Sequence, residues 1–380
     1  MMISRRNFLA VAGAAAAAAA LTACGGSSSS TSTASSTASS AASEAGSEAA
    51  SKITKVALTC DTGTIDDESF NQACWTAVSG YMGDDCQYYI PEADASDEDR
   101  ETMIRQAVND GAEVIVCVGY LYGASLAWAA EQYPDIKFIA IDVTQGDIGT
   151  DSIPANCYCI TFKEEQAGYL AGYAIAKDGK TKLGFLGGMA VPAVIRYGYG
   201  FVQGADAAAK EIGATDVNIK YWYSGGFAAT DEVKNKMDGW YSEGTEVVFA
   251  CGGPVCTSCD AAAKANGGKM IGVDVDQSGQ FDTVITSAMK GLAESVNEAL
   301  TDAMNNGWKF SETYSGKETK LGAAENCVGL PMSTSKFTKF TQEQYDSMYA
   351  SIVDGTLAID DSYDADVKPA VTTITVDYQS

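Results

Sequence analysis

Residues 61–72 hold the densest group of side chains that could bind a small polar molecule. They follow a short apolar run and read DTGTIDDESFNQ. Asp61 supplies an acceptor, Asn71 and the N–H groups of a helix start supply polar contacts, and Phe70 offers a flat face for stacking. In a second interpretation, Ser69 only caps the helix and Phe70 belongs to the core. The residues alone favour the two interpretations equally.

The residue types exclude several kinds of catalytic and metal site. The sequence contains no histidine, so Ser-His-Asp and Cys-His systems and histidine-based metal sites are excluded. Apart from Cys24, the cysteines are scattered and several lie in apolar runs, so we expect buried free thiols rather than a disulfide framework. Cys256 and Cys259 have redox or metal spacing, but with no second pair we interpret them as packing residues. We expect no catalytic residue, no metal and no cofactor.

The chain is strongly acidic. Its 50 Asp and Glu residues outnumber 25 Lys and Arg residues, for a formal net charge of −25. Such a field repels nucleic acid and anionic lipid headgroups, which argues against a polynucleotide or a bilayer surface as the ligand. The acidity also has a simpler interpretation, which is that it keeps an exposed protein soluble.

The N-terminus has the pattern of an export signal. Arg5 and Arg6 precede an alanine-rich apolar run that is too short and too small-sided for a stable membrane span. The run ends in Leu-Thr-Ala before Cys24, as at a lipoprotein cleavage site. We therefore expect a signal peptide over residues 1–23 and a lipid anchor on Cys24 at the outer face of the cell membrane. The alternative is an ordinary secretory peptide with an incidental cysteine.

The rest of the chain divides into a tether and a folded body. Residues 24–51 are almost wholly Gly, Ser, Thr, Ala and Glu, a composition typical of a flexible tether. The body, over residues 52–380, is too long for one core, so we expect two domains.

Strand-like runs alternate with helical patterns along the body, which is typical of an α/β protein with parallel sheets. The expected strands are 55–60, 87–91, 113–118, 138–142, 182–186, 217–222, 246–250 and 270–274. The expected helices are 70–81, 97–110, 121–132, 164–177, 197–212, 229–243 and 254–266. Nearer the C-terminus we expect a helix over 287–305 and strands over 351–357 and 371–376. Two similar rounds of strands and helices predict two lobes, whose loops at the carboxyl ends of the strands share one cleft.

Several motifs, in this order, resemble those of the basic membrane protein family of transporter-linked substrate-binding lipoproteins, whose best understood members are purine nucleoside receptors. The motifs are 66–72 (DDESFNQ), 133–138 (YPDIKF) with Asp142, 162–172 (FKEEQAGYLAG), 271–278 (IGVDVDQS) and 286–290 (TSAMK). The resemblance implies a type I periplasmic-binding fold, with two Rossmann-like lobes joined by a three-strand hinge. It leads us to expect lobe 1 over 52–160 and 282–325, and lobe 2 over 161–281 and 326–380.

The same resemblance implies a set of ligand contacts. Phe70 and Phe227 would sandwich a base from opposite lobes, and stacking of this kind contributes about 1–3 kcal/mol per base. Asp274 would accept both hydroxyls of a ribose, and Lys290 would donate to the sugar. The remaining expected contacts line the base, fix the loop or admit the ligand close to the backbone: Asp61, Ser69, Asn71, Asp142 and Gly252.

Each of these residues also has a structural interpretation. Phe227 could pack a core, Asp274 could cap a turn, and Lys290 could be a solvated helix charge; we interpret Asp276 as structural. Residues 119–124 (GYLYGA) depart from the family pattern, and the stretch from 276 to 286 is shorter than in relatives. These departures leave the preferred base or sugar open.

The expected function is therefore that of an extracytoplasmic, lipid-anchored receptor without catalytic activity. We expect a monomer that binds a small polar solute, foremost a purine nucleoside, and delivers it to the permease subunits of an ABC transporter. The alternatives are a sugar or signalling-molecule receptor of the same fold, a nucleoside-cleaving enzyme, and a surface lipoprotein used in adhesion or sensing.

Overall fold

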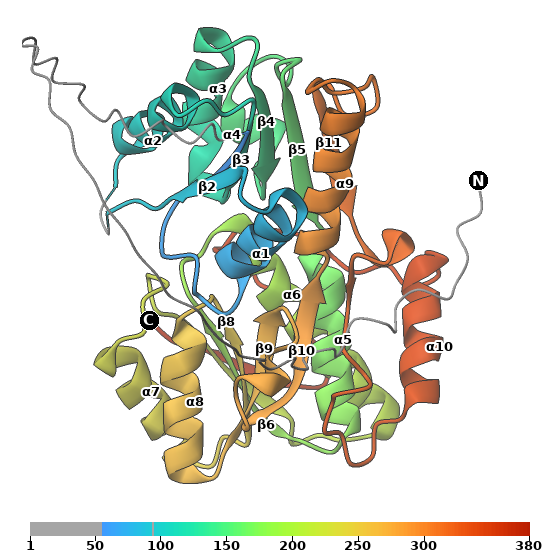
Figure 1. Cartoon of the computed structure of the whole chain (residues 1–380). Helices are drawn as coiled ribbons and strands as arrows, with labels where there is room; N and C mark the ends of the chain where they lie inside the picture. The colour runs from blue at the N-terminus through green and yellow to red at the C-terminus, as the bar shows by residue number, and fades with distance from the viewer. Residues whose placement is uncertain (1–54, 93–94) are drawn as a thin grey trace, which may run out of the picture. The chain divides into compact units, whose positions relative to one another are not determined.

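The computed structural model describes residues 55–92 and 95–380. The expected signal peptide, Cys24 and the expected tether lie outside the described residues. The described part of the chain forms two sheets, each with helices on both faces (Figure 1). The α/β class predicted from the alternation of strands and helices is confirmed.

The first sheet is wholly parallel, in the order β11-β5-β4-β3-β1-β2. Its strands are β1 (Val56–Cys60), β2 (Cys86–Tyr89), β3 (Val114–Val118), β4 (Lys137–Ile141), β5 (Cys157–Phe162) and β11 (Lys317–Leu321). One face is covered by α1 (Phe70–Met82) and α9 (Leu292–Asn305), and the other by α2 (Asp97–Asn109) and α3 (Gly123–Gln132). Covering both faces explains why β1, β3 and β5 consist mostly of apolar residues and are buried throughout.

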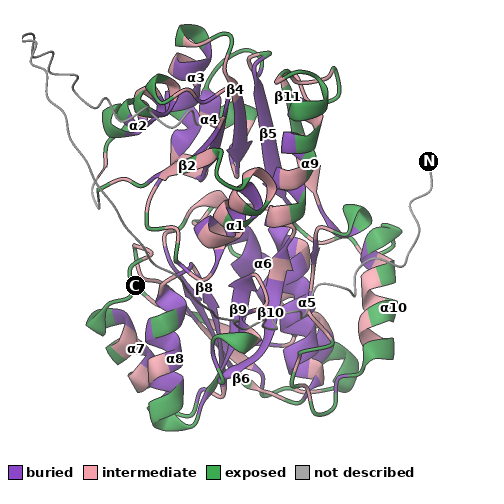
Figure 2. Ribbon diagram, viewed as in Figure 1, coloured by how far each residue is buried: buried purple, intermediate pink, exposed green. Residues whose placement is uncertain are grey.

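The second sheet has the order β12-β10-β9-β8-β6-β7-β13 and is parallel except for the pairing of β10 with β12. Its strands are β6 (Lys182–Gly187), β7 (Asn218–Tyr223), β8 (Val247–Cys251), β9 (Lys269–Asp274), β10 (Val284–Lys290), β12 (Val328–Gly329) and β13 (Thr375–Tyr378). The helices packed with this sheet are α5 (Glu164–Lys177), α6 (Pro192–Ile212), α7 (Asp231–Ser242) and α8 (Val255–Asn266). Figure 2 shows buried strands between helices whose outer sides are exposed.

Helices α5 and α6 touch through their backbones. A Cβ atom added at Gly172 of α5 would lie 2.0 Å from the carbonyl oxygen of Phe201, and one added at Gly204 of α6 would lie 2.0 Å from that of Tyr169. Real side chains do not fit at such distances, so glycine is required at these positions on both helices. The pair therefore forms one tightly joined layer, whose N-terminal parts carry residues of the site.

Within the described residues, the chain passes between the two sheets at three places. It leaves the first sheet after β5, returns to it after β10, and leaves it again after β11. Predicted lobe 1 included residues from 282 onward, but β10 pairs with β9 in the second sheet. We call the first sheet with its helices the first half of the molecule and the second sheet with its helices the second half. The chain therefore returns to the first half after Lys290, and that boundary of the prediction was wrong.

Three of the predicted elements near the C-terminus differ from the structure. Residues 287–290 were expected to begin a helix, but they complete β10. This strand is buried on both faces, so it lacks the alternation of apolar and polar residues that indicates a strand. Residues 351–357 were expected to form a strand, but α10 (Gln342–Val353) extends into them, started by a capping box of Thr341 and Gln344. The strand expected over 371–376 is β13, which begins at Thr375.

Two buried carboxylates hold the C-terminal part of the chain. Oδ1 of Asp178, at the end of α5, accepts the backbone N–H groups of Thr338, Lys339 and Phe340 at 2.6, 2.5 and 3.1 Å. Oδ1 of Asp206, on α6, does the same for residues 372, 373 and 374 at 3.0, 2.7 and 3.1 Å. Each carboxylate satisfies three successive donors that helix or sheet bonds leave free.

Nine cysteines of the described residues are free thiols: Cys60, Cys74, Cys117, Cys157, Cys159, Cys251, Cys256, Cys259 and Cys327. Most of them are buried among apolar side chains, and burial raises the pKa of Cys117, Cys157 and Cys259 to about 12. The expectation of buried thiols rather than a disulfide framework is confirmed for the described residues.

Replacing Asp206 is expected to release the segment that leads into β13. The change Asp206→Ala leaves three N–H groups without their acceptor, and the free energy of unfolding should fall by about 3 kcal/mol. Urea denaturation measures the loss, and limited proteolysis should cut the variant first between residues 355 and 374. The exposed Asp216→Ala is the matched control. Equal stability and equal cleavage of all three proteins would show that the carboxylate does not hold the segment.

Candidate functional site

Most of the expected ligand contacts lie at or just after the carboxyl ends of strands. Asp61 follows β1, Asp142 follows β4 and Gly252 follows β8, while Asp274 and Lys290 are the last residues of β9 and β10. Phe227 lies in the loop after β7. These ends are where open α/β sheets bind ligands. Contacts between residues of the two halves define the candidate site.

The loop before α1 is held by Asp67, not by Ser69. The carboxylate of Asp67 accepts the N–H groups of Ser69, Asn71 and Gln72 at 3.0, 2.9 and 3.0 Å. The hydroxyl of Ser69 makes no capping bond; it donates to Oδ2 of Asp274 at 2.6 Å. Ser69 therefore points at the opposite half of the site, and its interpretation as a helix cap was wrong.

Asp274 is a buried acceptor whose two oxygens both receive hydroxyl groups. Oδ2 accepts from Ser69, and Oδ1 accepts from the hydroxyl of Tyr197 at 3.3 Å. The backbone of Asp274 has φ +65°, and that of Asp142 has φ +61°, a left-handed conformation that is uncommon outside glycine and costs free energy. The surrounding fold thus maintains an unfavourable backbone conformation at both carboxylates.

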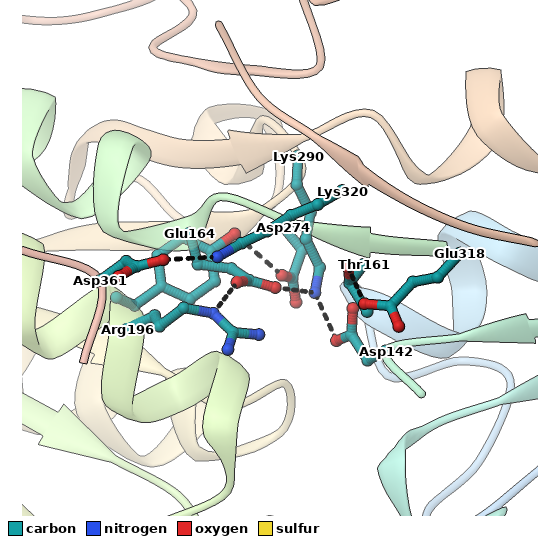
Figure 3. Close-up of polar contacts among 10 residues, drawn as sticks. Asp142, Thr161, Glu164, Arg196, Asp274, Lys290, Glu318, Lys320 and Asp361 are labelled. Carbon is teal, nitrogen blue, oxygen red and sulfur yellow. Dashed lines mark hydrogen bonds and ion pairs between the residues drawn. The ribbon is translucent and has the colours of Figure 1, made fainter. Parts of the chain in front are cut away.

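Lys290 connects the two halves. Its Nζ donates to Oδ2 of Asp142 at 2.6 Å and to Oε1 of Glu164 at 3.4 Å (Figure 3). It also lies 4.6 Å from the centre of the Phe70 ring and 5.1 Å from that of Phe162. Burial by itself lowers the pKa of Lys290, but the carboxylates around it outweigh burial and raise that pKa. The ammonium therefore stays charged and acts as a donor, and the interpretation of Lys290 as a solvated helix charge was wrong.

The two expected stacking rings belong to different halves. Phe70 is half-buried beside the first-sheet core and beneath Lys290. Phe227 is half-buried beside the second-sheet core, and its ring lies against Gly188 and Gly252, where an added Cβ would be 2.4 and 3.0 Å from it. Gly252 has φ +151°, so a side chain there would be both strained and in contact with the ring. A face-to-face arrangement of Phe70 and Phe227 stays a prediction.

Asp61 and Asn71 both shape the loop between β1 and α1. The carboxylate of Asp61 accepts the N–H of Leu121 at 3.0 Å, and its backbone oxygen accepts from Nε of Arg100 at 3.1 Å. The amide of Asn71 donates to the carbonyls of Thr62 and Thr64 at 2.9 and 3.1 Å, while its buried Oδ1 has no partner within the described residues. That oxygen is an available acceptor.

Two charged residues of the site were not predicted. Glu164 is fully buried, and its Oε2 accepts from Nε of Arg196 at 2.7 Å. Glu164 was missed because the helix dipole already explains a carboxylate in the first turn of a helix. Arg196 was missed because the predicted helix began at residue 197, whereas α6 begins with a proline at its first position, Pro192. Asp276 caps the short helix at Gln277–Gly279, as its structural interpretation predicted.

A family model described as "Bmp: ABC transporter substrate-binding protein PnrA-like" matches residues 53–362. Basic membrane protein A of Borreliella burgdorferi is 30% identical over 307 residues, which are 80% of this chain and 86% of that protein. The ABC transporter nucleoside-binding protein BmpA of Lactococcus lactis subsp. cremoris is 26% identical over 331 residues, covering 80% and 88% of the two chains.

The fold is similar to that of solved solute-binding proteins. A crystal structure of an ABC transporter system solute-binding protein from Aeropyrum pernix K1 superposes with a TM-score of 0.69 at 21% identity, over 82% of this chain and 95% of that one. The predicted type I periplasmic-binding fold, with two lobes of the Rossmann kind, is confirmed.

The buried carboxyl of Asp61 predicts a pH dependence of stability. Burial raises its pKa from the ordinary 3.8 to about 7, although the N–H of Leu121 and the charge of Arg100 oppose the shift and Asp142 adds to it. Between about pH 4 and 7 the folded chain holds a proton that the unfolded chain releases, so the contribution of Asp61 to stability falls as the pH rises. The variant Asp61→Asn lacks this loss.

Urea denaturation at pH 4.5, 6 and 8 measures the effect. The free energy of unfolding of the wild type, minus that of Asp61→Asn, should fall from pH 4.5 to pH 8, by about 1.4 kcal/mol for each unit of pKa difference. Exposed Asp135→Asn controls for the loss of one negative charge. A difference that stays constant or rises over this range would contradict the raised pKa.

Proposed function

Because the chain belongs to the PnrA-like family of ABC transporter substrate-binding proteins, we propose that its ligand is a purine nucleoside. The family consists of binding proteins, not enzymes; they act outside the cytoplasm and hand a small molecule to the permease of their transporter. That class of function applies to this chain. The nucleoside, the residues that bind it and the lipid anchor are the parts that we propose.

The arrangement of donors to Asp274 is the observation that carries the proposal. An ionised carboxylate is an acceptor with two oxygens, and each oxygen here faces a hydroxyl group, from Ser69 and from Tyr197. The 2′- and 3′-hydroxyls of a ribose form the same pair of donors on adjacent carbons. We infer that they bind to Asp274 in competition with the two side chains.

The charges of the site favour a neutral ligand that is rich in donors. Lys290 faces the carboxylates of Asp142 and Glu164, and Arg196 shares that of Glu164, so both cations already have anionic partners. A nucleoside brings hydroxyl and ring N–H donors and no charge. The rings of Phe70 and Phe227 and the free acceptor Oδ1 of Asn71 would receive its base. The name of the Lactococcus lactis relative, a nucleoside-binding protein, agrees with this ligand.

Lobe closure explains how such a receptor signals that it is loaded. The bond of Ser69 to Asp274 joins the two halves, and so does the bond of Nε2 of Gln277 to the backbone oxygen of Glu68 at 3.0 Å. A ligand that touches both halves stabilises the form in which they meet, because the open form offers it only one half. The permease would dock on that closed form.

Calorimetric titration of the full chain with inosine, guanosine, adenosine, ribose and glucose tests the proposal. Heat of binding is expected with at least one purine nucleoside. Heat with a sugar and none with the nucleosides would replace the nucleoside by a sugar, and release of free hypoxanthine from inosine would show an enzyme.

Phe227→Ala is expected to raise the Kd for the nucleoside by about 10- to 100-fold, because one stacking face is lost. The control is Phe337→Ala. Phe337 is also half-buried beside the second-sheet core, but it lies near Asp178 at the opposite end of α5 from the site. Equal Kd values for the Phe227 variant and the wild type would remove Phe227 from the binding site.

We also propose that acyl chains on Cys24 anchor the chain, because the sequence before that residue has the pattern of a lipoprotein cleavage site. Within the described residues, no helix combines the length and the apolar character needed to cross a bilayer. Mass spectrometry of the protein extracted from membranes should find a lipid-modified Cys24 at the N-terminus, and Cys24→Ser should move the protein to the soluble fraction. An unmodified mature chain that begins elsewhere would show an ordinary secretory peptide.

A further inference from the structure

Glu164 and Arg196 form a buried ion pair next to the expected ligand contacts. Their side chains are 0% and 6% exposed, and Nε of Arg196 donates to Oε2 of Glu164 at 2.7 Å. The other oxygen of Glu164 faces Nζ of Lys290 at 3.4 Å. One carboxylate therefore serves two cations, one on each oxygen, and Figure 3 shows the line that runs from Arg196 through Glu164 and Lys290 to Asp142.

Stability alone gives little reason for this pair. Taking two charges out of water costs about as much free energy as their attraction returns, and an apolar pair of similar volume is often as stable. What an apolar pair would not supply is a carboxylate beside Lys290.

Arg196 keeps that carboxylate charged. Burial by itself raises the pKa of Glu164, but the charges of Arg196 and Lys290 outweigh burial and lower that pKa. Without Arg196, the carboxyl group would keep a single cation at 3.4 Å and would more readily take up a proton. A neutral Glu164 attracts the ammonium of Lys290 only weakly.

The ammonium of Lys290 would then be held mainly by its other partner, Asp142. Asp142 lies 2.6 Å from Nζ and belongs to the first half, while Glu164 starts α5 in the second half. Lys290 has three N–H donors, of which these two carboxylates take two. The direction of the third donor is set by both anchors together, since an ammonium held at one point can rotate about that bond.

We propose that Glu164 and Arg196 are positioning residues, which fix the ammonium of Lys290 so that its third N–H meets one hydroxyl of the ligand's sugar. This inference rests on the proposed function, because it takes the partner of Lys290 to be the sugar of a nucleoside. It assigns a role in recognition to two residues that do not touch the ligand.

The test compares how variants of the full chain discriminate among inosine and its 2′-, 3′- and 5′-deoxy forms. In Arg196→Met, the Kd for inosine should rise about tenfold, the size expected for one charge-assisted bond. One of the deoxy forms lacks the hydroxyl bound by Lys290. Its Kd should be nearly the same for Arg196→Met and for the wild type. Arg196→Lys keeps the charge and should restore part of the affinity. Equal losses for all four ligands would overturn the inference, since a purely structural role predicts them.

A double variant guards against misfolding. Glu164→Gln with Arg196→Met removes both charges of the pair, so neither is left buried without the other, and the double variant should fold even if the single variant does not. It should show the same selective loss, and an unchanged pattern of affinities would overturn the inference. Arg105→Met is the control; it breaks a pair with Glu101 on α2, where the Arg105 side chain is 39% exposed.

Crystal structures of the ligand-free wild type and the double variant separate this inference from the proposed function. Nζ of Lys290 should lie between Asp142 and residue 164 in the wild type and should move away from residue 164 in the variant. An unmoved Nζ would overturn the inference, whichever ligand the protein binds. If the wild type binds no nucleoside but Nζ still differs between the two structures as expected, only the proposal that the ligand is a nucleoside is overturned.

Discussion

A single ammonium group, that of Lys290, is shared between a carboxylate of each half of the molecule, and the rest of the site is organised by this sharing. A buried cation needs anionic partners, so Asp142 and Glu164 must approach it from their own elements. Asp142 adopts a left-handed backbone conformation to do so, and Glu164 begins the helix at the first chain crossing. Because Lys290 itself ends the strand before the second crossing, the charges lie where the two halves are covalently joined.

Much of the fold was predictable from the sequence because buried parallel strands are continuous apolar runs and amphipathic helices separate them. The same logic explains the failures. The last part of β10 reads Thr-Ser-Ala-Met-Lys, which has too few large apolar side chains to look like a central strand, although it is buried between β9 and β12. The chain around 351 reads as strand-like when taken alone, and only the cap at Thr341 shows that it ends a helix.

The sequence predicted which segments form the site, because they carry recognisable motifs. It did not predict the roles of single side chains. Ser69 illustrates the limit. Its place before an apolar helix is that of a cap, but Asp67 already fills the capping role, which leaves the Ser69 hydroxyl free to reach Asp274, more than two hundred residues away. Such a choice depends on which acceptor the fold brings near. Glu164 was missed because a carboxylate in the first turn of a helix has an ordinary explanation there, and Arg196 was missed because it lies before the start of the predicted helix.

The glycine contacts between α5 and α6 have a mechanical consequence. Helices that interlock through bare backbone cannot slide or roll against each other without collision, so the layer behaves as one stiff plate. Glu164 lies at the start of α5 and Arg196 near the start of α6, so both belong to this rigid pair of helices. The pairing of Glu164 with Arg196 therefore does not depend on how the two halves meet, and the carboxylate beside Lys290 keeps its place relative to the second sheet.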